Sequence, residues 1–290
     1  MLKQLGFSIV RAAIKALNVR GDSKDAELDE VVDDLNEKDE LPSQDESKLD
    51  NLQEQTESGD VWSQCFLGAM YYDGKGVPQN YSKAVKWYRK AAEQGEELAQ
   101  FTLGAMYCEG QGVPQDYSKG MSWFEKAAEQ GKCEAQLNLG VMYYEGEGVP
   151  RDYSNAMSWF RKAAEQGEAE AQALLGLMYS NGEGVPQNYS KAVKWYRKAA
   201  EQGYAWAQAL LGSMYRKGEG VPRDYSKAVK WYRKAAEHGE PDAQFNLGGM
   251  YANGEGVSKD NSKAVEWFRK AAEQGVPKAQ FNLGGMYANG

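Results

Sequence analysis

A strict 36-residue repeat constrains this 290-residue chain more than any other feature. The dipeptide Leu-Gly begins at residues 67, 103, 139, 175, 211, 247 and 283. In the complete copies Met-Tyr follows, then Gly-x-Gly-Val-Pro or a close variant, an Asp or Asn, and a tryptophan next to a second aromatic residue. Residues 76–95 and 184–203 are identical, which indicates growth by internal duplication. A period of this length is typical of arrays of one supersecondary unit.

Each repeat is predicted to form two helices joined by a turn. In the first helix, Ala99, Leu103 and Met106 fall on one stripe of a 3.6-residue period. Gly110 is placed to end that helix in a left-handed conformation, and Asp116 is placed to cap the second helix. One such pair cannot bury both apolar faces, so the copies are expected to stack.

The second helix has its own apolar stripe. Ala84, Trp87 and Tyr88 recur at helical spacing, and equivalent residues stand in each complete copy. We predict that the periodic tryptophans and tyrosines belong to the core and have no ligand role. Gly104, beside Leu103, indicates a close approach of two backbones.

The unit AxxxLGxMYxxGxGVPxDYxKAxxWxxKAAEQG resembles the Sel1-like repeat, a relative of the tetratricopeptide repeat. The resemblance covers residues 61–290, as six full copies and a terminal first helix. It implies an all-α fold, a right-handed α-solenoid, and a non-catalytic scaffold or adaptor that binds a protein or peptide. The sixth copy departs from the pattern, with Ser258 for Pro and Asn261 for Tyr, which puts the rigidity of that turn in doubt.

Charge divides the chain into three parts. Residues 1–21 carry a net charge of +4, residues 22–60 carry −13, and the remainder is close to neutral. We predict a basic amphipathic helix over 1–21, an acidic and largely disordered linker over 22–45, and the solenoid over 46–290. Residues 46–59 align with a worn second helix and are predicted to cap the array. Because the sequence stops at Gly290, where a first helix ends, we expect either a fragment, which we favour, or an end that docks on another chain.

The N-terminal segment supports more than one interpretation. It either lies on an anionic membrane or docks on a partner, or it packs loosely on its own chain or lacks order. A secretory signal is disfavoured because basic residues interrupt the apolar stretch. The residues expected to make a membrane or partner contact are Leu5, Phe7, Ile9, Arg11, Ile14 and Lys15.

Positions that vary among the copies predict a binding surface. In the first helix they include 98, 102, 105 and 109, which form one continuous face opposite the packed one. In tetratricopeptide-like solenoids this face lines the concave groove. Asparagines there can bond a peptide backbone, Leu174 and Leu210 can form an apolar pocket, and Arg216 can pair with a carboxylate. The predicted groove residues are Tyr72, Thr102, Asn138, Tyr144, Leu174, Trp206, Leu210, Arg216, Lys217, Asn246 and Asn282.

Other function classes find little support. The near-neutral repeats lack the charge balance of a nucleic-acid binder, and no apolar run is long enough to span a bilayer. The single histidine, His238, replaces a glutamine of the repeat, and Cys65, Cys108 and Cys133 show no metal-ligand spacing. We therefore predict no metal, no cofactor and no enzymatic activity.

Two alternatives to the groove-binding scaffold stay open. One is a membrane-surface scaffold tethered through residues 1–20, and the weaker one is a β-lactamase-like hydrolase. Some secreted, cysteine-rich relatives of the repeat are described as β-lactamases, but their regular cysteine pairs are absent here. The unpaired cysteines favour a cytoplasmic location, with or without peripheral membrane contact.

Overall fold

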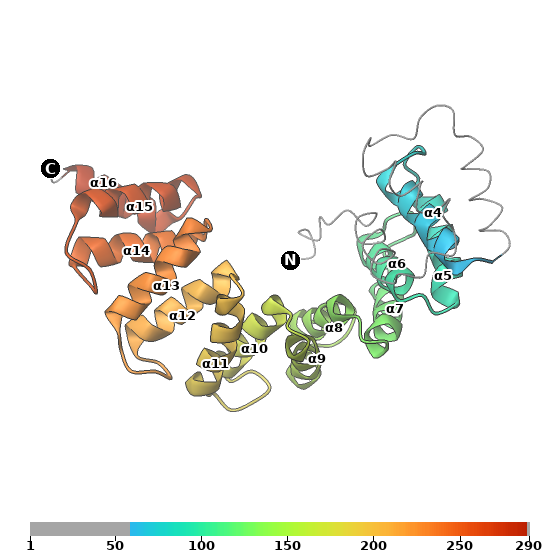
Figure 1. Cartoon of the computed structure of the whole chain (residues 1–290), viewed down its shortest axis with the longest axis horizontal. Helices are drawn as coiled ribbons and strands as arrows, with labels where there is room; N and C mark the ends of the chain where they lie inside the picture. The colour runs from blue at the N-terminus through green and yellow to red at the C-terminus, as the bar shows by residue number, and fades with distance from the viewer. Residues whose placement is uncertain (1–58, 289–290) are drawn as a thin grey trace. The chain divides into compact units, whose positions relative to one another are not determined.

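The computed structural model describes residues 59–288, which form thirteen α-helices and no strand (Figure 1). As predicted, the fold is an all-α solenoid of helix–turn–helix repeats, with six helix pairs followed by one further first helix. The first helix of each repeat, called helix A, is α4 Val61–Asp73, α6 Glu97–Glu109, α8 Cys133–Glu145, α10 Ala169–Asn181, α12 Ala205–Lys217, α14 Pro241–Asn253 or α16 Pro277–Ala288. The second, called helix B, is α5 Tyr81–Glu93, α7 Tyr117–Glu129, α9 Tyr153–Glu165, α11 Tyr189–Glu201, α13 Tyr225–Glu237 or α15 Asn261–Glu273.

The helices divide into two compact units, and each is described by itself. Unit 1 ends at Arg151 and includes α4 to α8, whereas unit 2 begins at Asp152 and includes α9 to α16. In both units a helix A packs on a helix B of its own repeat and on the helix B before it. The predicted segments 1–21 and 22–45, and the predicted cap except for Gly59, lie outside the described residues.

The turns between helices A and B follow the predicted residues. Gly110 ends α6 in the left-handed region, with φ of 71°, and its N–H donates to the carbonyl of Met106. The side chain of Asp116 then accepts a bond of 3.0 Å from the backbone N–H of Lys119 and so caps α7. The sixth copy keeps this arrangement, since Asp260 caps α15 in the same way. Its substitutions therefore leave the backbone of the turn unchanged.

The core lies between helices A and B. Leu103, Met106 and Phe124 have no exposed surface. At Gly104 an added Cβ would stand 2.8 Å from the Phe124 ring and 3.0 Å from the carbonyl oxygen of Gly120, which confirms the predicted close approach. Only the missing side chain allows the two helices to lie this near to each other.

The periodic tryptophans lie at the edge of the predicted core in most copies. Trp87 is 9% exposed, but its five equivalents are only half-buried, and the aromatic residue that follows each of them fills the core. A lysine three residues later lies over each of these indole rings, as Lys126 Nζ does at 3.8 Å from the Trp123 centroid. The tryptophans thus form an outer layer with a cation over it. The five half-buried tryptophans are Trp123, Trp159, Trp195, Trp231 and Trp267.

Buried glutamines join one repeat to the next, a feature that the sequence analysis missed. Gln100 of α6 donates to the carbonyl of Ala92 in the preceding repeat across 3.1 Å. Its side-chain oxygen accepts a bond of 2.8 Å from Gln130, at the end of α7. Equivalent pairs occur in both units, and we call this series the glutamine ladder. His238 occupies one place in it, with Nδ1 at 3.4 Å from the side-chain oxygen of Gln208.

The second glycine of the Gly-x-Gly turn makes another contact between repeats, from Gly112 onward. Gly112 has φ of 71°, and an added Cβ there would lie 2.4 Å from the backbone carbonyl carbon of Tyr81, at the start of α5. The turn of one repeat therefore packs directly against the first residue of the helix B in the preceding repeat. We call this contact the glycine seam.

Candidate binding surface

One face of helix A carries most of the predicted groove residues. The residue directly before each Leu-Gly pair marks it, together with the residues one turn to either side on the same helix. We call this surface the A face. In unit 1 it is marked by Phe66, Thr102 and Asn138, and in unit 2 by Leu174, Leu210, Asn246 and Asn282.

The A face of unit 1 is closed. Phe66, Thr102 and Asn138 are 2%, 1% and 6% exposed. The expectation that Thr102 and Asn138 lie open to solvent is therefore wrong, and so is the same expectation for Leu174, which is 4% exposed. The Thr102 hydroxyl and the Asn138 amide nitrogen are buried without a hydrogen-bond partner.

The A face of unit 2 is closed at Leu174 and more open from Leu210 onward. Leu210, Asn246 and Asn282 are half-exposed. Trp206 lies one turn before Leu210 and is also half-exposed, with its ring edge-on to Tyr204 at a centroid distance of 6.3 Å. This part of α12 thus presents an aromatic and an aliphatic side chain next to each other.

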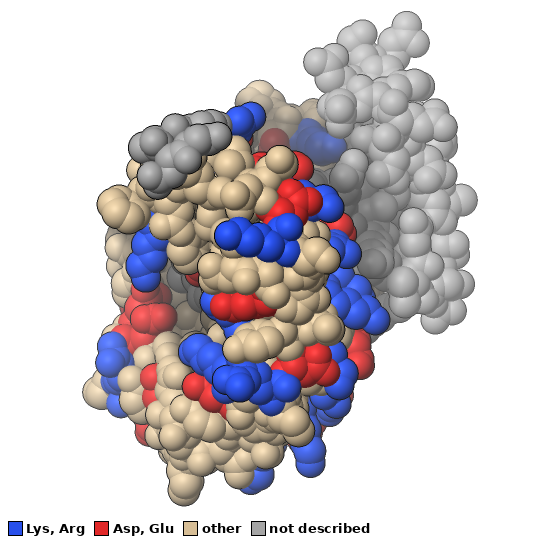
Figure 2. Space-filling model, turned by 90° about the vertical axis from the view of Figure 1, so that its left-hand side faces the viewer, with Lys and Arg blue, Asp and Glu red and all other residues tan. Residues whose placement is uncertain are grey.

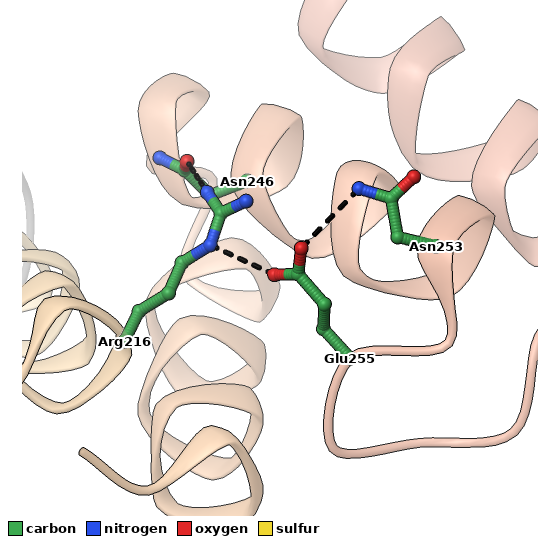
Figure 3. A network of polar contacts seen from close by, with 4 residues as sticks. All are labelled: Arg216, Asn246, Asn253 and Glu255. Atoms are coloured by element: carbon green, nitrogen blue, oxygen red, sulfur yellow. Dashed lines mark hydrogen bonds and ion pairs between the residues drawn. The ribbon is translucent and has the colours of Figure 1, made fainter.

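Arg216 is held by contacts within unit 2, as Figure 3 shows. Its Nε donates to Glu255 across 2.9 Å, and its Nη1 donates to the side-chain oxygen of Asn246 across 3.2 Å. Glu255 also accepts a bond of 3.3 Å from Asn253. The carboxylate predicted for Arg216 is therefore supplied by the chain itself. Asn246 is also engaged, because its amide nitrogen donates to the backbone oxygen of Asp242.

A cleft of about 260 Å³ lies beside this network. It is polar and aromatic, and its cation is fixed in place by the bond to Glu255. An arginine has five N–H donors, and the two bonds above use two of them, so Arg216 keeps donors for a carbonyl or carboxylate oxygen. The cleft is lined by Ser213, Arg216, Lys217, Tyr225, Tyr232, Asn246 and Glu255.

The remaining predicted residues differ in their surroundings. Lys217 has a side chain that is 60% exposed, with Nζ at 3.8 Å from Glu219. Tyr72 of unit 1 packs edge-on against Tyr81 at 5.2 Å between ring centroids, and burial, helped by the charge of Glu109, raises its pKa to about 12. Tyr144 is half-buried. Whether these residues bind a partner stays a prediction.

Charge and metal-ligand chemistry add little in the part of the chain that the structure describes. On the face in Figure 2, basic and acidic side chains are interspersed, so this face has no continuous basic stripe. Cys65, Cys108 and Cys133 are not joined in disulfides, and residues 59–288 contain no group of three or more potential ligands that could hold a metal ion. Among these residues, no helix combines the length and the apolar character needed to cross a bilayer.

Comparison with solved structures finds close similarity in fold and sequence. A protective antigen of uropathogenic Escherichia coli, c5321, which displays the SLR fold, is 44% identical over 81% of this chain, with a TM-score of 0.79. The match covers 50% of that antigen, so this chain spans about half of its length. A Sel1 repeat protein from Oxalobacter formigenes is 35% identical over 78% of this chain and 90% of its own, with a TM-score of 0.69. No curated protein matches the chain.

The repeats also match a family model directly. The Sel1 repeat model fits seven segments, from residue 63 to the last residue of the sequence. They are residues 63–96, 98–132, 133–168, 169–204, 207–240, 241–276 and 277–290. The chain therefore belongs to the Sel1 repeat family, whose members are generally protein-interaction scaffolds.

Proposed function

We propose that this chain is a non-catalytic scaffold that holds a peptide or protein partner on the A face of unit 2. One observation carries the proposal. Trp206 and Leu210 lie half-exposed one turn apart on α12, and the Arg216 cleft opens two turns further along the same helix. Apolar anchors beside a pre-positioned cation are the features that dominate protein interfaces.

The partner's chemistry follows from these groups. An apolar side chain of the partner fits against Leu210 and Trp206, while a backbone carbonyl or an acidic group accepts from Arg216. Because Glu255 already fixes the guanidinium, binding does not have to order that long side chain. An extended segment that carries both an apolar residue and a hydrogen-bond acceptor matches this surface best.

Substitution of Leu210 by glutamate tests the proposal. The full-length chain is used to capture partners from native extract, and bound proteins are quantified by mass spectrometry. Because a buried charge opposes apolar contact, Leu210→Glu is expected to reduce a specific partner by about tenfold or more, a loss typical of a central anchor residue. Ser158→Glu is the matched control, since it adds the same charge at an exposed position of α9, in a helix B of the same unit.

Both variants must show the same far-ultraviolet circular dichroism as the native chain, which establishes that the helical fold is intact. Equal capture by Leu210→Glu, Ser158→Glu and the native chain would place the partner site elsewhere. The alternative tether through residues 1–20 concerns a segment outside the described residues, and it stays a prediction.

A further inference from the structure

One position of the repeat is sealed from water in unit 1 and half-open in unit 2, although the residue is the same. Asn138 of α8 and Asn246 of α14 both directly precede Leu-Gly, yet Asn138 is 6% exposed and Asn246 is half-exposed. The preceding helix A does not explain this difference, because it offers the small Thr102 in unit 1 and the larger Leu210 in unit 2. On their own helices the surroundings differ, because Val141 follows Asn138 one turn later where Gly249 follows Asn246. A further cover over Asn138 would account for the rest of the difference in burial.

This cover leaves polar atoms without partners. The Thr102 hydroxyl and the Asn138 amide nitrogen are both buried and make no hydrogen bond. Burial of an unpaired polar group is unfavourable. Such groups in a folded protein call for a partner that supplies the missing hydrogen bond. These two residues hold equivalent positions on neighbouring A helices of one unit, so a single segment can satisfy both.

We propose that residues 1–20 of this same chain form a helix that occupies the A face of unit 1. The sequence predicts an amphipathic helix there, with Leu5, Ile9 and Ile14 on its broad apolar side. The A face offers matching apolar surface at Phe66 and Leu98, which are 2% and 6% exposed. Ser8 and Gln4, on the polar side of the segment, carry the oxygens that the unpaired atoms lack.

Charge complementarity favours this occupant. Glu134 lies one turn before Asn138 on the same face of α8, and Glu145 lies two turns after it. Glu109 holds the position on α6 that Glu145 holds on α8. Among the ion pairs of the described residues, Lys132 Nζ lies 3.5 Å from the Glu134 carboxylate, and none involves Glu109 or Glu145. The segment 1–20 carries four basic residues and no acid. A basic helix is therefore attracted to the acidic side chains of Glu109, Glu134 and Glu145.

Length also permits the contact. A helix of 20 residues is about 30 Å long, so it can reach beyond one A helix of 13 residues, which is about 20 Å long. Residues 21–58 connect it to α4, and a chain of that length can extend to roughly 130 Å. The connection therefore sets no limit on where the segment binds.

Thiol reactivity tests the proposal in the full-length chain. Asn138→Cys and Asn246→Cys are made separately in a Cys133→Ser background, where Cys65 and Cys108 are buried. The two introduced thiols occupy the same place in the repeat, so each is the other's control. If a bound segment opens in only a few per cent of molecules, the thiol at 138 reacts with dithiobis-nitrobenzoate about tenfold or more slowly than the thiol at 246.

Release of the segment is the second arm. Ile9→Asp with Ile14→Asp changes residues outside the described repeats and is expected to bring the rate at 138 to that at 246, without changing the rate at 246. Arg11→Glu with Lys15→Glu is expected to raise the rate at 138 in a salt-dependent manner.

Three results would overturn the proposal. Equal rates at the two positions in the native N-terminal background would show an open face. Slow reaction at 138 that persists in the Ile9→Asp/Ile14→Asp chain would show a different cover, and protection that falls on dilution would show a second copy. The proposal is independent of the function assigned to unit 2, because Leu210→Glu is expected to leave the rate at 138 unchanged.

Discussion

Gln130, at the end of α7, donates a hydrogen bond of 2.8 Å to the side-chain oxygen of Gln100 on α6. Gln100 is 4% exposed, and its amide nitrogen donates a second hydrogen bond to the carbonyl of Ala92 in the preceding repeat. A buried amide that both accepts and donates is fully used only when its two neighbours are in place. The glutamine ladder therefore ties the stability of one repeat to the position of the next.

Loss of one member of the ladder is expected to be costly. Gln100→Ala leaves the Ala92 carbonyl without its side-chain donor and opens a gap between repeats. We expect the free energy of unfolding to fall by about 1–3 kcal/mol, measured by urea denaturation. Gln280→Ala is the matched control, because Gln280 is exposed and bonds to Ala272 across 3.3 Å. An equal loss in both variants would mean that the buried ladder adds nothing specific.

Restoration of the repeat residue at His238 is expected to stabilise the chain. His238 approaches Gln208 only to 3.4 Å, whereas the glutamines at this place reach 2.8–2.9 Å. His238→Gln should therefore raise the free energy of unfolding by about 0.5–1 kcal/mol, the net worth of an ordinary hydrogen bond. Calorimetry of His238→Gln beside His238→Ala checks this, since a gain in both variants would point to removal of the imidazole instead.

The glycine seam is expected to tolerate no side chain. Gly112→Ala combines a left-handed φ of 71° with a Cβ that would lie 2.4 Å from the Tyr81 backbone. Gly131→Ala has φ of 100° but open space around the new Cβ, so it measures the conformational cost alone. We expect a loss of about 1 kcal/mol for Gly131→Ala and at least about 2 kcal/mol more for Gly112→Ala. Similar denaturation midpoints for the two variants would contradict the seam.

Glu96 is expected to make stability depend on pH. Burial raises the pKa of this carboxyl, although its oxygen caps α6 by accepting from the backbone N–H of Ala99. The folded chain then holds a proton that the unfolded chain releases, so stability falls as pH rises from the unfolded pKa near 4.3 through the raised folded pKa. Glu96→Gln should therefore be more favourable, relative to the native chain, at pH 7 than at pH 4.

Asp116 provides the opposite sign. Bonds from the backbone N–H and side chain of Lys119 lower the pKa of its carboxyl, so its contribution is present above the unfolded pKa and is lost as pH falls through the folded pKa. Asp116→Asn, which keeps a capping residue found in other copies, should be less favourable at pH 7 than at pH 4. Urea denaturation of both variants at the two pH values makes the comparison, and the same sign in both would refute the assignment.

The fold was predictable because each repeat contains residues that mark where its helices begin, end and pack closely. Gly110, Asp116 and Gly104 each have a local reason to be where they are, and the structure confirms all three. The sequence did contain a signal for the glutamine ladder. A glutamine stands three residues before every Leu-Gly pair, at the position of Gln100, and a polar residue that never varies there indicates a buried polar contact. The half-buried tryptophans had one too, since a lysine follows each of them at the next turn.

The candidate site was less predictable, since exposure depends on what lies over a residue as well as on its repeat position. Leu174 and Leu210 are the same residue at the same place, but only Leu210 is half-exposed. Arg216 was predicted to pair with a carboxylate of a partner, yet Glu255, 39 residues away in the turn of the next repeat, supplies that carboxylate. Spacing within one repeat contains no information on either point.

The glycine seam bears on how such a chain changes over time. The contact between Gly112 and Tyr81 recurs with the same residue types at Gly148 and Tyr117 in unit 1 and at Gly220 and Tyr189 in unit 2. These junctions have the same residue types on both sides. A gene can gain or lose 36 codons at such a junction and keep the contact between glycine and tyrosine, and the variable side chains of helix A can diverge while this contact stays the same. Recombination between near-identical copies is thus a direct route to new binding surfaces, with stability preserved at each step.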